Sequence, residues 1–305
     1  MTLDQLRVFA AVAQRQHITR AAEALNMTQS AASAAIASLE REFGTKFFHR
    51  IGRGIILTEG GSLFFDEARA ILTRVEAAHL AMREFVGLAR GRLGIMASHT
   101  IAGHFLPSLL VEFQRAYPGV QLAVSVGNSE QVKAAILDGS IELGFTEGPQ
   151  TEVADPELAF EIVAHDKLTL IVAPQHPWAA MTSLKGLELA RGQWVVREDG
   201  SGTRASFFSI LQGFGVTRGE VEIVLELPSN HAVLTAVAAG AGPAILSGRV
   251  CQAAIIAGHV VGLPVALRQR AFYAVQHKDR YRSRAVAAFL EIIRKNAVDT
   301  ANSFD

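Results

Sequence analysis

Two short alanine-rich segments separated by an asparagine constrain the first sixty residues of the chain most strongly. The segments cover residues 20–25 and 28–36, and Asn26 stands between them. Alanine side chains let two helices cross closely, and asparagine tolerates the left-handed backbone of a tight turn. Thr19 and Thr28 are expected to cap the two helices. The pattern therefore predicts a helix-turn-helix.

The second of these helices presents polar side chains in its first turns. Apolar residues at i, i+4 and i+7 spacing, beginning at Ala32, face inward and leave a polar face outside. Gln and Ser side chains there can hydrogen-bond to base edges, and the free backbone amides of a helix N-terminus suit a phosphate. We therefore expect this helix to enter the major groove of DNA with Thr28, Gln29, Ser30 and Ser33.

A basic hairpin follows the predicted recognition helix. Residues 47–57 form two short apolar stretches around a glycine-flanked tip that carries Arg50 and Arg53. We expect both arginines to contact the sugar-phosphate backbone, as a wing does, with Arg20 as a further phosphate contact. A small alanine-rich helical domain without DNA binding is the alternative, but the ordered series of features favours DNA.

Composition narrows the remaining choices. The 305 residues suggest two or three domains, and the formal net charge of zero argues against a general nucleic-acid coat protein. The single Cys251 cannot form an intrachain disulfide, and no histidine pair has metal-ligand spacing, so we expect no metal. The N-terminus does not resemble a signal peptide, and the longest weakly polar run, residues 234–246, is too short to span a bilayer. These features predict a cytoplasmic protein with no membrane partner.

A long proline-free segment, residues 59–88, is predicted to form one helix with a heptad seam. A partner helix is the favoured neighbour of this seam, and packing on the chain's own globular domain is the alternative. Pairing would also present two DNA readers to an inverted repeat. The predicted dimerisation residues are Phe64, Ala68, Ile71, Val75, Ala78, Met82 and Phe85.

Beyond a predicted hinge at residues 89–91, strands and helices alternate. This βαβ rhythm predicts a mostly parallel sheet. The last strand and helix, residues 271–275 and 283–295, are one unit too many for a second lobe and could return to the first. The other predicted strands are residues 93–97, 120–126, 141–145, 168–173, 194–196, 221–225 and 243–246, with helices over 101–115 and 129–137.

Hydroxyl, amide and charged residues follow several predicted strands directly. Ligands of open α/β sheets bind at the carboxyl ends of strands, and the segment from Gly200 to Arg204 combines close backbone approach, hydroxyl donors and a guanidinium fork. The alternative is ordinary helix capping, with Arg204 paired to Glu198 or Asp199. The candidate ligand residues are Ser98, His99, Thr100, Asn128, Ser129, Glu147, Ser201, Gly202, Thr203 and Arg204.

Several of these motifs resemble those of the LysR-type transcriptional regulators. The resemblance rests on Leu6-x-x-Phe9, Ala21-Ala22-x-x-Leu25, Thr28-Gln29-Ser30-Ala31-x-Ser33, Leu39-Glu40, Phe48-x-Arg50 and Leu57-Thr58-x-x-Gly61. The chain departs from the family pattern at His17-Ile18-Thr19 and at Ala34-Ala35, which removes side chains from the middle of the recognition helix.

The resemblance implies an α/β fold with an N-terminal all-α winged helix-turn-helix, a long linker helix and two Rossmann-like lobes of the periplasmic-binding-protein type. Crossovers are implied near Ala164 and Leu267. The corresponding domains are residues 1–58 for DNA binding, 59–88 for the linker helix, 92–163 with 268–305 for lobe I, and 164–267 for lobe II. A dimer, often assembled into a tetramer, is also implied.

Residues 197–204, 127–131 and 147–149 look like the branch of the family that regulates carbon fixation and sulfur or sulfite metabolism. That similarity implies a small anionic effector, an oxyanion, phosphorylated sugar or carboxylate, bound between the lobes, and no other cofactor. The expected partners are double-stranded DNA with inverted-repeat sites, a second copy of the chain and RNA polymerase. A metabolic enzyme acting on a phosphorylated or carboxylated substrate, or a scaffold that uses the linker helix alone, are the alternatives.

Overall fold

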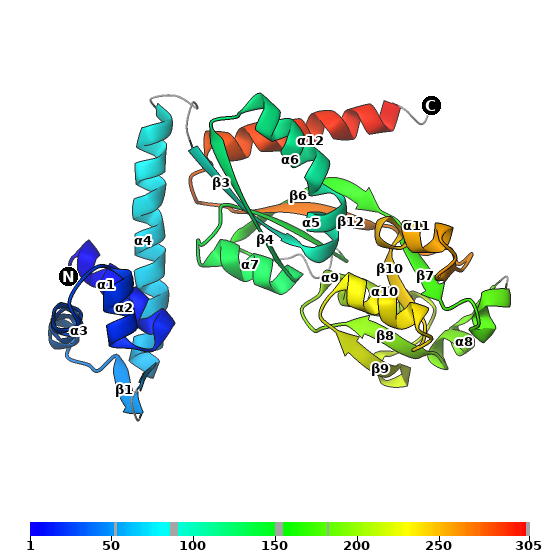
Figure 1. Ribbon diagram of the computed structural model, residues 1–305, viewed down its shortest axis with the longest axis horizontal. Coiled ribbons are helices and arrows are strands. Elements are labelled where there is room, and N and C mark those ends of the chain that lie inside the picture. The colour runs from blue at the N-terminus through cyan, green and yellow to red at the C-terminus, as the bar shows by residue number, and fades with distance from the viewer. Residues whose placement is uncertain (52–53, 86–90, 150–154, 182, 303–305) are drawn as a thin grey trace. The chain divides into compact units, whose positions relative to one another are not determined.

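The structure is a computed structural model that describes residues 1–51, 54–85, 91–149, 155–181 and 183–302. The chain divides near residue 86 into two compact units, which are described separately (Figure 1). Among the described residues, no helix is long and apolar enough to cross a membrane.

The N-terminal unit is a winged helix-turn-helix. Three helices, α1 (Leu3–Arg15), α2 (Ile18–Ala24) and α3 (Gln29–Phe43), precede an antiparallel hairpin of β1 (Phe48–Ile51) and β2 (Gly54–Leu57). The rings of Phe9, Phe47 and Phe64 meet in its core, and the Phe47 and Phe64 rings stack with centroids 4.6 Å apart. Burial of such large side chains contributes about 1.5–3 kcal/mol each. The predicted fold class is therefore confirmed for this unit.

Local backbone signals account for most of the helix boundaries in this unit. Asn26 has φ of 53°, Gly44 ends α3 at φ of 64°, and Thr28 Oγ1 accepts from the Ala31 amide at 3.2 Å. The prediction that Thr19 caps the second helix is wrong. His17 is the cap, because its Nδ1 accepts from the Arg20 amide at 3.4 Å and the helix begins at Ile18, so Thr19 lies inside it.

The long helix α4 (Glu59–Phe85) packs against the winged helix-turn-helix over its first half. Ala68 is fully buried there, and Phe64 and Ile71 contact the same core. These three residues therefore contact the chain's own domain, which is the alternative considered for this seam. Farther along, Val75 is half-buried, Ala78 is exposed and Met82 is 68% exposed. The Phe85 side chain lies outside the described residues.

The C-terminal unit begins with lobe I, a five-stranded sheet. Its strands are β3 (Gly91–Ser98), β4 (Val120–Gly127), β5 (Leu143–Gly148), β6 (Leu158–Asp166) and β12 (Arg270–His277), in the order β4-β3-β5-β12-β6. β3 runs parallel to β4 and β5, whereas β12 is antiparallel to both of its neighbours. The last strand thus lies in the middle of lobe I. Gly91, predicted in the hinge, belongs to the ladder opposite Val120.

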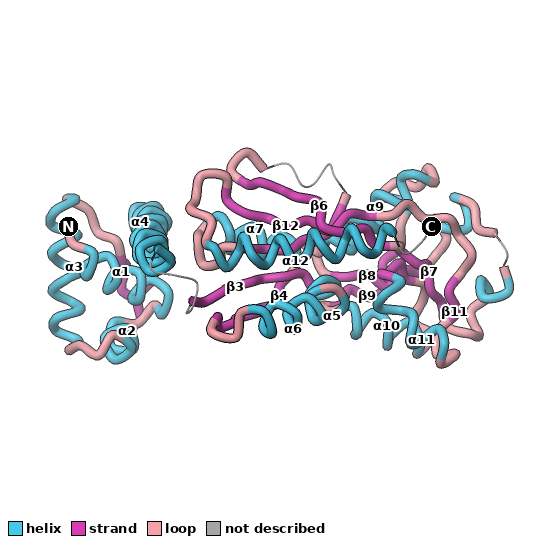
Figure 2. The backbone as a smooth tube through the Cα atoms, turned by 90° about the horizontal axis from the view of Figure 1, so that it is seen from above, coloured by secondary structure: helices cyan, strands magenta, loops and turns pink. Residues whose placement is uncertain are grey.

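Helices cover both faces of the lobe I sheet. α6 (Leu106–Ala116) and α12 (Arg284–Asn302) lie on one face, where Phe113, Phe145 and Phe289 pack edge to face (Figures 1 and 2). α7 (Ser129–Leu137) packs on the other face with Tyr273. The single helix predicted over residues 101–115 is two, α5 (His99–His104) and α6, because Pro107 favours a new helix start.

Lobe II combines an antiparallel sheet, β10-β7-β11, with a parallel pair, β8-β9. Its core contains Trp178, Trp194 and Phe207. The chain enters at Lys167, directly after β6, and returns to β12 after residue 269. The strands are β7 (Leu168–Val172), β8 (Gln193–Arg197), β9 (Glu222–Leu227), β10 (Ala244–Ser247) and β11 (Val261–Gly262); the helices are η2 (Pro177–Ala180), α8 (Gly186–Ala190), α9 (Gly202–Gly213), η3 (Arg218–Glu220), α10 (Asn230–Ala238) and α11 (Gly248–Ile256).

Two adjacent glycines of α4 provide a matched stability test. A Cβ on Gly61 would meet the Phe47 carbonyl oxygen at 2.0 Å, whereas one on Gly60 has its nearest neighbour at 3.8 Å. We expect Gly61→Ala to destabilise the N-terminal unit by about 1–3 kcal/mol through overpacking. Gly60→Ala should be neutral or stabilising by up to about 1 kcal/mol. Urea unfolding followed by circular dichroism measures both, and equal stabilities would contradict this account of the close approach.

Candidate functional site

The first turns of α3 carry the predicted DNA-reading side chains at the surface. Gln29 and Ser30 are exposed, Ser33 is half-buried, and Ser30 Oγ lies 3.0 Å from Thr28 Oγ1. Thr28 therefore acts as the helix cap, while the adjacent side chains remain accessible. Arg20 is exposed in α2. Arg50 lies in strand β1 with its side chain undescribed, and Arg53 falls outside the described residues.

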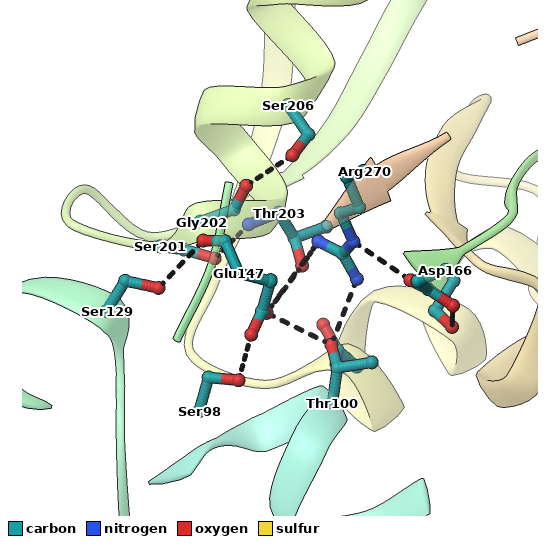
Figure 3. Close-up of polar contacts among 12 residues, drawn as sticks. Ser98, Thr100, Ser129, Glu147, Asp166, Ser201, Gly202, Thr203, Ser206 and Arg270 are labelled. Carbon is teal, nitrogen blue, oxygen red and sulfur yellow. Dashed lines mark hydrogen bonds and ion pairs between the residues drawn. The ribbon is translucent and has the colours of Figure 1, made fainter. Parts of the chain in front are cut away.

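A second cluster of polar residues is buried between lobes I and II, with the Glu147 carboxylate at its centre (Figure 3). Glu147 is near the end of β5 and only 4% exposed. Ser98 Oγ and Thr100 Oγ1 of lobe I donate to it, the latter at 3.2 Å. Thr203 Oγ1 of lobe II donates at 3.4 Å. Hydroxyls of both lobes thus converge on one carboxylate.

Arg270, the first residue of β12, connects this cluster to Asp166 at the end of β6, where the chain passes between the lobes. Its Nε donates to Asp166 Oδ2 at 2.9 Å, and its Nη1 donates to Thr203 Oγ1 at 3.0 Å. Its Nη2 reaches Thr100 Oγ1 at 3.3 Å, while Nη1 lies 3.7 Å from Glu147 Oε1. Asp166 also accepts from Ser247 Oγ at 2.7 Å. One guanidinium therefore contacts both lobes and the end of β6 at once.

A second buried guanidinium extends the network into lobe II. Arg197 donates to both carboxylate oxygens of Glu198, at 2.7 and 2.8 Å, and to Asn230 Oδ1 at 2.7 Å. Asn230 Nδ2 in turn donates to Thr100 Oγ1 at 2.8 Å. Burial and the charge of Arg197 lower the pKa of His99, which favours its neutral imidazole. Burial raises the pKa of Glu198, but its hydrogen bonds to Arg197 outweigh this and leave it below the ordinary value.

Gly202 allows the two lobes to approach each other at this point. A Cβ on Gly202 would lie 1.8 Å from the Glu147 carbonyl oxygen and 2.7 Å from Ser129 Oγ. Ser129 Oγ donates to that same carbonyl at 3.1 Å. The glycine at the start of α9 thus lets lobe II pack directly on β5 of lobe I, as Figure 3 shows.

A pocket of about 290 Å³ opens beside the buried cluster. Glu147, Gly148 and Thr146 form part of its wall, and Lys133, Arg204 and Arg218 bring cations to it. Arg204 pairs with Glu226, and Lys133 pairs with Glu130 at 2.6 Å. The Arg218 guanidinium lies 4.5 Å from the centroid of the Phe208 ring, which also lines the pocket.

The predicted ligand residues fall into two groups. Asn128 and Ser201 are helix caps, because they accept from the Gln131 and Thr203 amides. Asn128 Nδ2 also donates across to Asp199 O at 3.2 Å. Ser98 makes no capping bond, and its hydroxyl points into the cluster instead. Arg204 pairs with Glu226 of β9, and neither of its predicted surface partners, Glu198 and Asp199, is its ion pair.

Four residues of this cluster were not among the ligand candidates predicted from the sequence: Asp166, Arg197, Asn230 and Arg270. The available signal was a charged residue at the end of an apolar strand, as at Asp166 and Arg197, or at its start, as at Arg270. Strand alternation cannot distinguish such a residue from a solvent-facing one. Only the pairing of β12 with β6 brings Arg270 opposite Asp166.

Comparison with known proteins matches both units. Residues 3–62 match the bacterial regulatory helix-turn-helix protein family model, lysR family, and residues 87–298 match the LysR substrate binding domain. The transcriptional regulator YeiE of Escherichia coli is 33% identical over 95% of this chain and 96% of its own length. The chain belongs to the LysR family of transcriptional regulators. The predictions of the family and of a protein that is not an enzyme are thereby confirmed.

Further relatives support the predicted branch of the family. The RuBisCO operon transcriptional regulator of Allochromatium vinosum is 31% identical, with 97% of each chain covered. Full-length CbnR in complex with its target DNA has the same fold, with a TM-score of 0.69 at 22% identity over 97% of this chain and 99% of CbnR. The regulatory domain of Synechocystis CcmR, solved with 2-PG, has a TM-score of 0.61 at 25% identity over 68% of this chain and 97% of that domain.

Replacing Arg270 tests the buried ion cluster. Arg270→Met would leave the buried Asp166 without the guanidinium that donates to it at 2.9 Å, and we expect a loss of about 3–5 kcal/mol in unfolding free energy. Arg294→Met is the control, because Arg294 also forms a bidentate pair, with Glu161, but both side chains are at least 38% exposed. That loss should be about 1 kcal/mol or less. Tryptophan fluorescence during urea unfolding reports lobe II, and similar losses would contradict the assigned role.

The single cysteine is expected to be chemically inert in the folded protein. Cys251 is fully buried in α11, and burial raises the pKa of its thiol to about 12. Since the thiolate is the reactive form, a thiol reagent at pH 8 should label it only after denaturation. Labelling with 5,5′-dithiobis(2-nitrobenzoate) with and without guanidinium measures this. Rapid labelling of the native protein would overturn the expectation.

Proposed function

We propose that this LysR-type regulator senses a small anionic effector between lobes I and II and thereby changes how paired winged helices engage DNA. The observation that carries the proposal is the convergence of Thr100, Thr203 and Arg270 from both lobes on one buried point. An anion held by donors from both lobes stabilises one relative arrangement of them. An effector shifts such an equilibrium only through this differential affinity.

The proposed ligand region comprises Arg270 and the ten candidate ligand residues predicted from the sequence. Those ten are Ser98, His99, Thr100, Asn128, Ser129, Glu147, Ser201, Gly202, Thr203 and Arg204. Oxyanions, phosphorylated sugars and carboxylates all accept hydrogen bonds from hydroxyl and guanidinium donors. The 2-PG complex of the CcmR regulatory domain supports a small anion in a related domain. We propose that the pocket of about 290 Å³ beside the cluster gives the effector access.

We further propose a homo-oligomer built through α4 and assembled as a dimer or a dimer of dimers. Of the predicted seam, the exposed Ala78 and Met82 and the half-buried Val75 are the described positions left for a partner helix. Inverted-repeat promoter sites and RNA polymerase are the proposed partners in the cytoplasm. The domain boundaries proposed for this arrangement are those expected from the sequence, 92–163 and 268–305 for lobe I, with two changes. Lobe I begins at Gly91, and β6 extends it to Asp166 before the chain enters lobe II.

Effector binding is tested with a thermal-shift panel of sulfite, sulfate, phosphorylated sugars and dicarboxylates. We expect at least one anion to stabilise the protein by about 3 kcal/mol at a hundredfold excess over its Kd. Thr100→Val and Thr203→Val should weaken that anion at least tenfold, because each removes a hydroxyl. Thr235→Val, on the exposed side of α10, is the matched control and should not weaken it. Absence of stabilisation by every anion would overturn the proposal.

DNA recognition is tested by fluorescence anisotropy with operator and random duplexes at several salt concentrations. Gln29→Ala and Ser33→Ala should relax sequence preference by about 1–3 kcal/mol at the contacted base pair. Arg20→Ala, Arg50→Ala and Arg53→Ala should weaken binding to both duplexes and lower the salt slope by about one each. An unchanged salt dependence of binding would contradict the proposal that these arginines contact phosphates.

A further inference from the structure

We propose that the Glu147 carboxylate is a resident occupant of the effector's anion position, so that an anionic effector binds by exchange with it. This inference rests on the proposed function, because it concerns the same region between the lobes. The carboxylate now holds the donors that an incoming anion requires. These donors are therefore already engaged by a carboxylate of the chain itself.

The hydrogen bonds around Glu147 are those of a bound ligand. Ser98 and Thr100 donate from lobe I, Thr203 donates from lobe II, and the Arg270 guanidinium lies 3.7 Å away. The residue is 4% exposed, so water does not share these donors freely. A carboxylate with hydroxyl donors from two lobes and a nearby guanidinium has the surroundings expected for a carboxylate or oxyanion effector.

A structural counter-ion is the competing explanation, and the distances argue against it. Arg270 already has a counter-ion in Asp166, at 2.9 Å in a bond that donates from Nε. Asp166 is 1% exposed and accepts a further bond from Ser247. Arg270 is thus neutralised without Glu147, whose longer contact of 3.7 Å is not needed to bury the guanidinium.

The charges of the described cluster leave no cation for an additional anion. Its guanidiniums are Arg197, Arg270 and the half-exposed Arg249, which lies 3.9 Å from Asp166. They face three carboxylates, Glu198, Asp166 and Glu147, so every cation of the cluster already has a carboxylate. A second anion beside Glu147 would meet a like charge a few ångströms away, where Coulomb repulsion in a protein is strong. Release of the Glu147 carboxylate from the donors removes that repulsion.

The pocket beside Glu147 provides room for the exchange of its carboxylate with an effector. Glu147 also lines the pocket of about 290 Å³, to which Lys133 and Arg204 contribute cations paired only with partly exposed carboxylates. Surface pairs of this kind are weak enough to be exchanged. The hydrogen bond between Glu147 and Thr203 joins the two lobes. When an effector replaces Glu147 there, the contact between the lobes depends on the bound effector.

The test is to remove the resident charge and measure anion affinity in the full-length protein by isothermal titration calorimetry. We expect Glu147→Gln to bind sulfate at least tenfold more tightly than the wild type. Glu147→Ala should bind acetate at least tenfold more tightly, because acetate replaces the missing carboxylate. Glu161→Gln, the same change at an exposed acid of β6, should alter neither affinity by more than about twofold.

Failure of the inference is distinguishable from failure of the proposed function. If the wild type binds an anion through Thr100 and Thr203 but neither Glu147 variant binds sulfate or acetate more tightly, the resident role is overturned and the proposed function stands. If no anion of the panel binds the wild type or any variant, both are overturned. Thermal unfolding without anion checks that each variant folds, and Glu147→Asp, which keeps the charge, should show no tenfold gain for sulfate.

Discussion

The buried contact between Arg270 and Asp166 is the interaction on which the architecture of the C-terminal unit depends. A buried guanidinium is tolerated only when a carboxylate compensates its charge, and here the compensating Asp166 stands at the end of β6. The pairing therefore requires β12 to lie beside β6, which inserts the end of the chain into lobe I. From that position the remaining guanidinium nitrogens reach Thr100 and Thr203. One ion pair thus links chain topology to the arrangement of the lobes.

The two units use different physical means to hold their candidate functional residues. In the winged helix-turn-helix, caps and aromatic packing hold α3 while the first-turn side chains remain exposed. In the C-terminal unit, the candidate ligand residues Thr100, Glu147 and Thr203 are buried and hydrogen-bonded to one another, so their geometry depends on the relative position of two lobes. Exposed side chains on a rigid helix suit a large, preformed ligand such as DNA. A buried, interlobe cluster suits a small ligand whose binding changes a conformational equilibrium.

Local signals in the sequence predicted local structure well. Asn26, Thr28 and Gly44 act through backbone groups within a few residues, so their roles were readable without tertiary information. The prediction that Thr19 is the cap was wrong because the helix begins two residues earlier than expected, at Ile18, with His17 as its cap. The heptad pattern of α4 predicted an apolar face but not its neighbour. Phe64 and Ala68 satisfy the pattern by packing on their own domain.

By itself, the sequence determined the family, the order of the elements and the set of polar residues that follow strands, because these depend on composition and on spacing within short segments. The tertiary structure decided which of those polar residues cap helices, as Asn128 and Ser201 do, and which meet between the lobes, as Ser98, Thr100 and Thr203 do. It also brought Asp166 and Arg270 together across 104 residues of chain. Such contacts follow from strand order and lobe packing, and no local pattern encodes the partner of a buried charge.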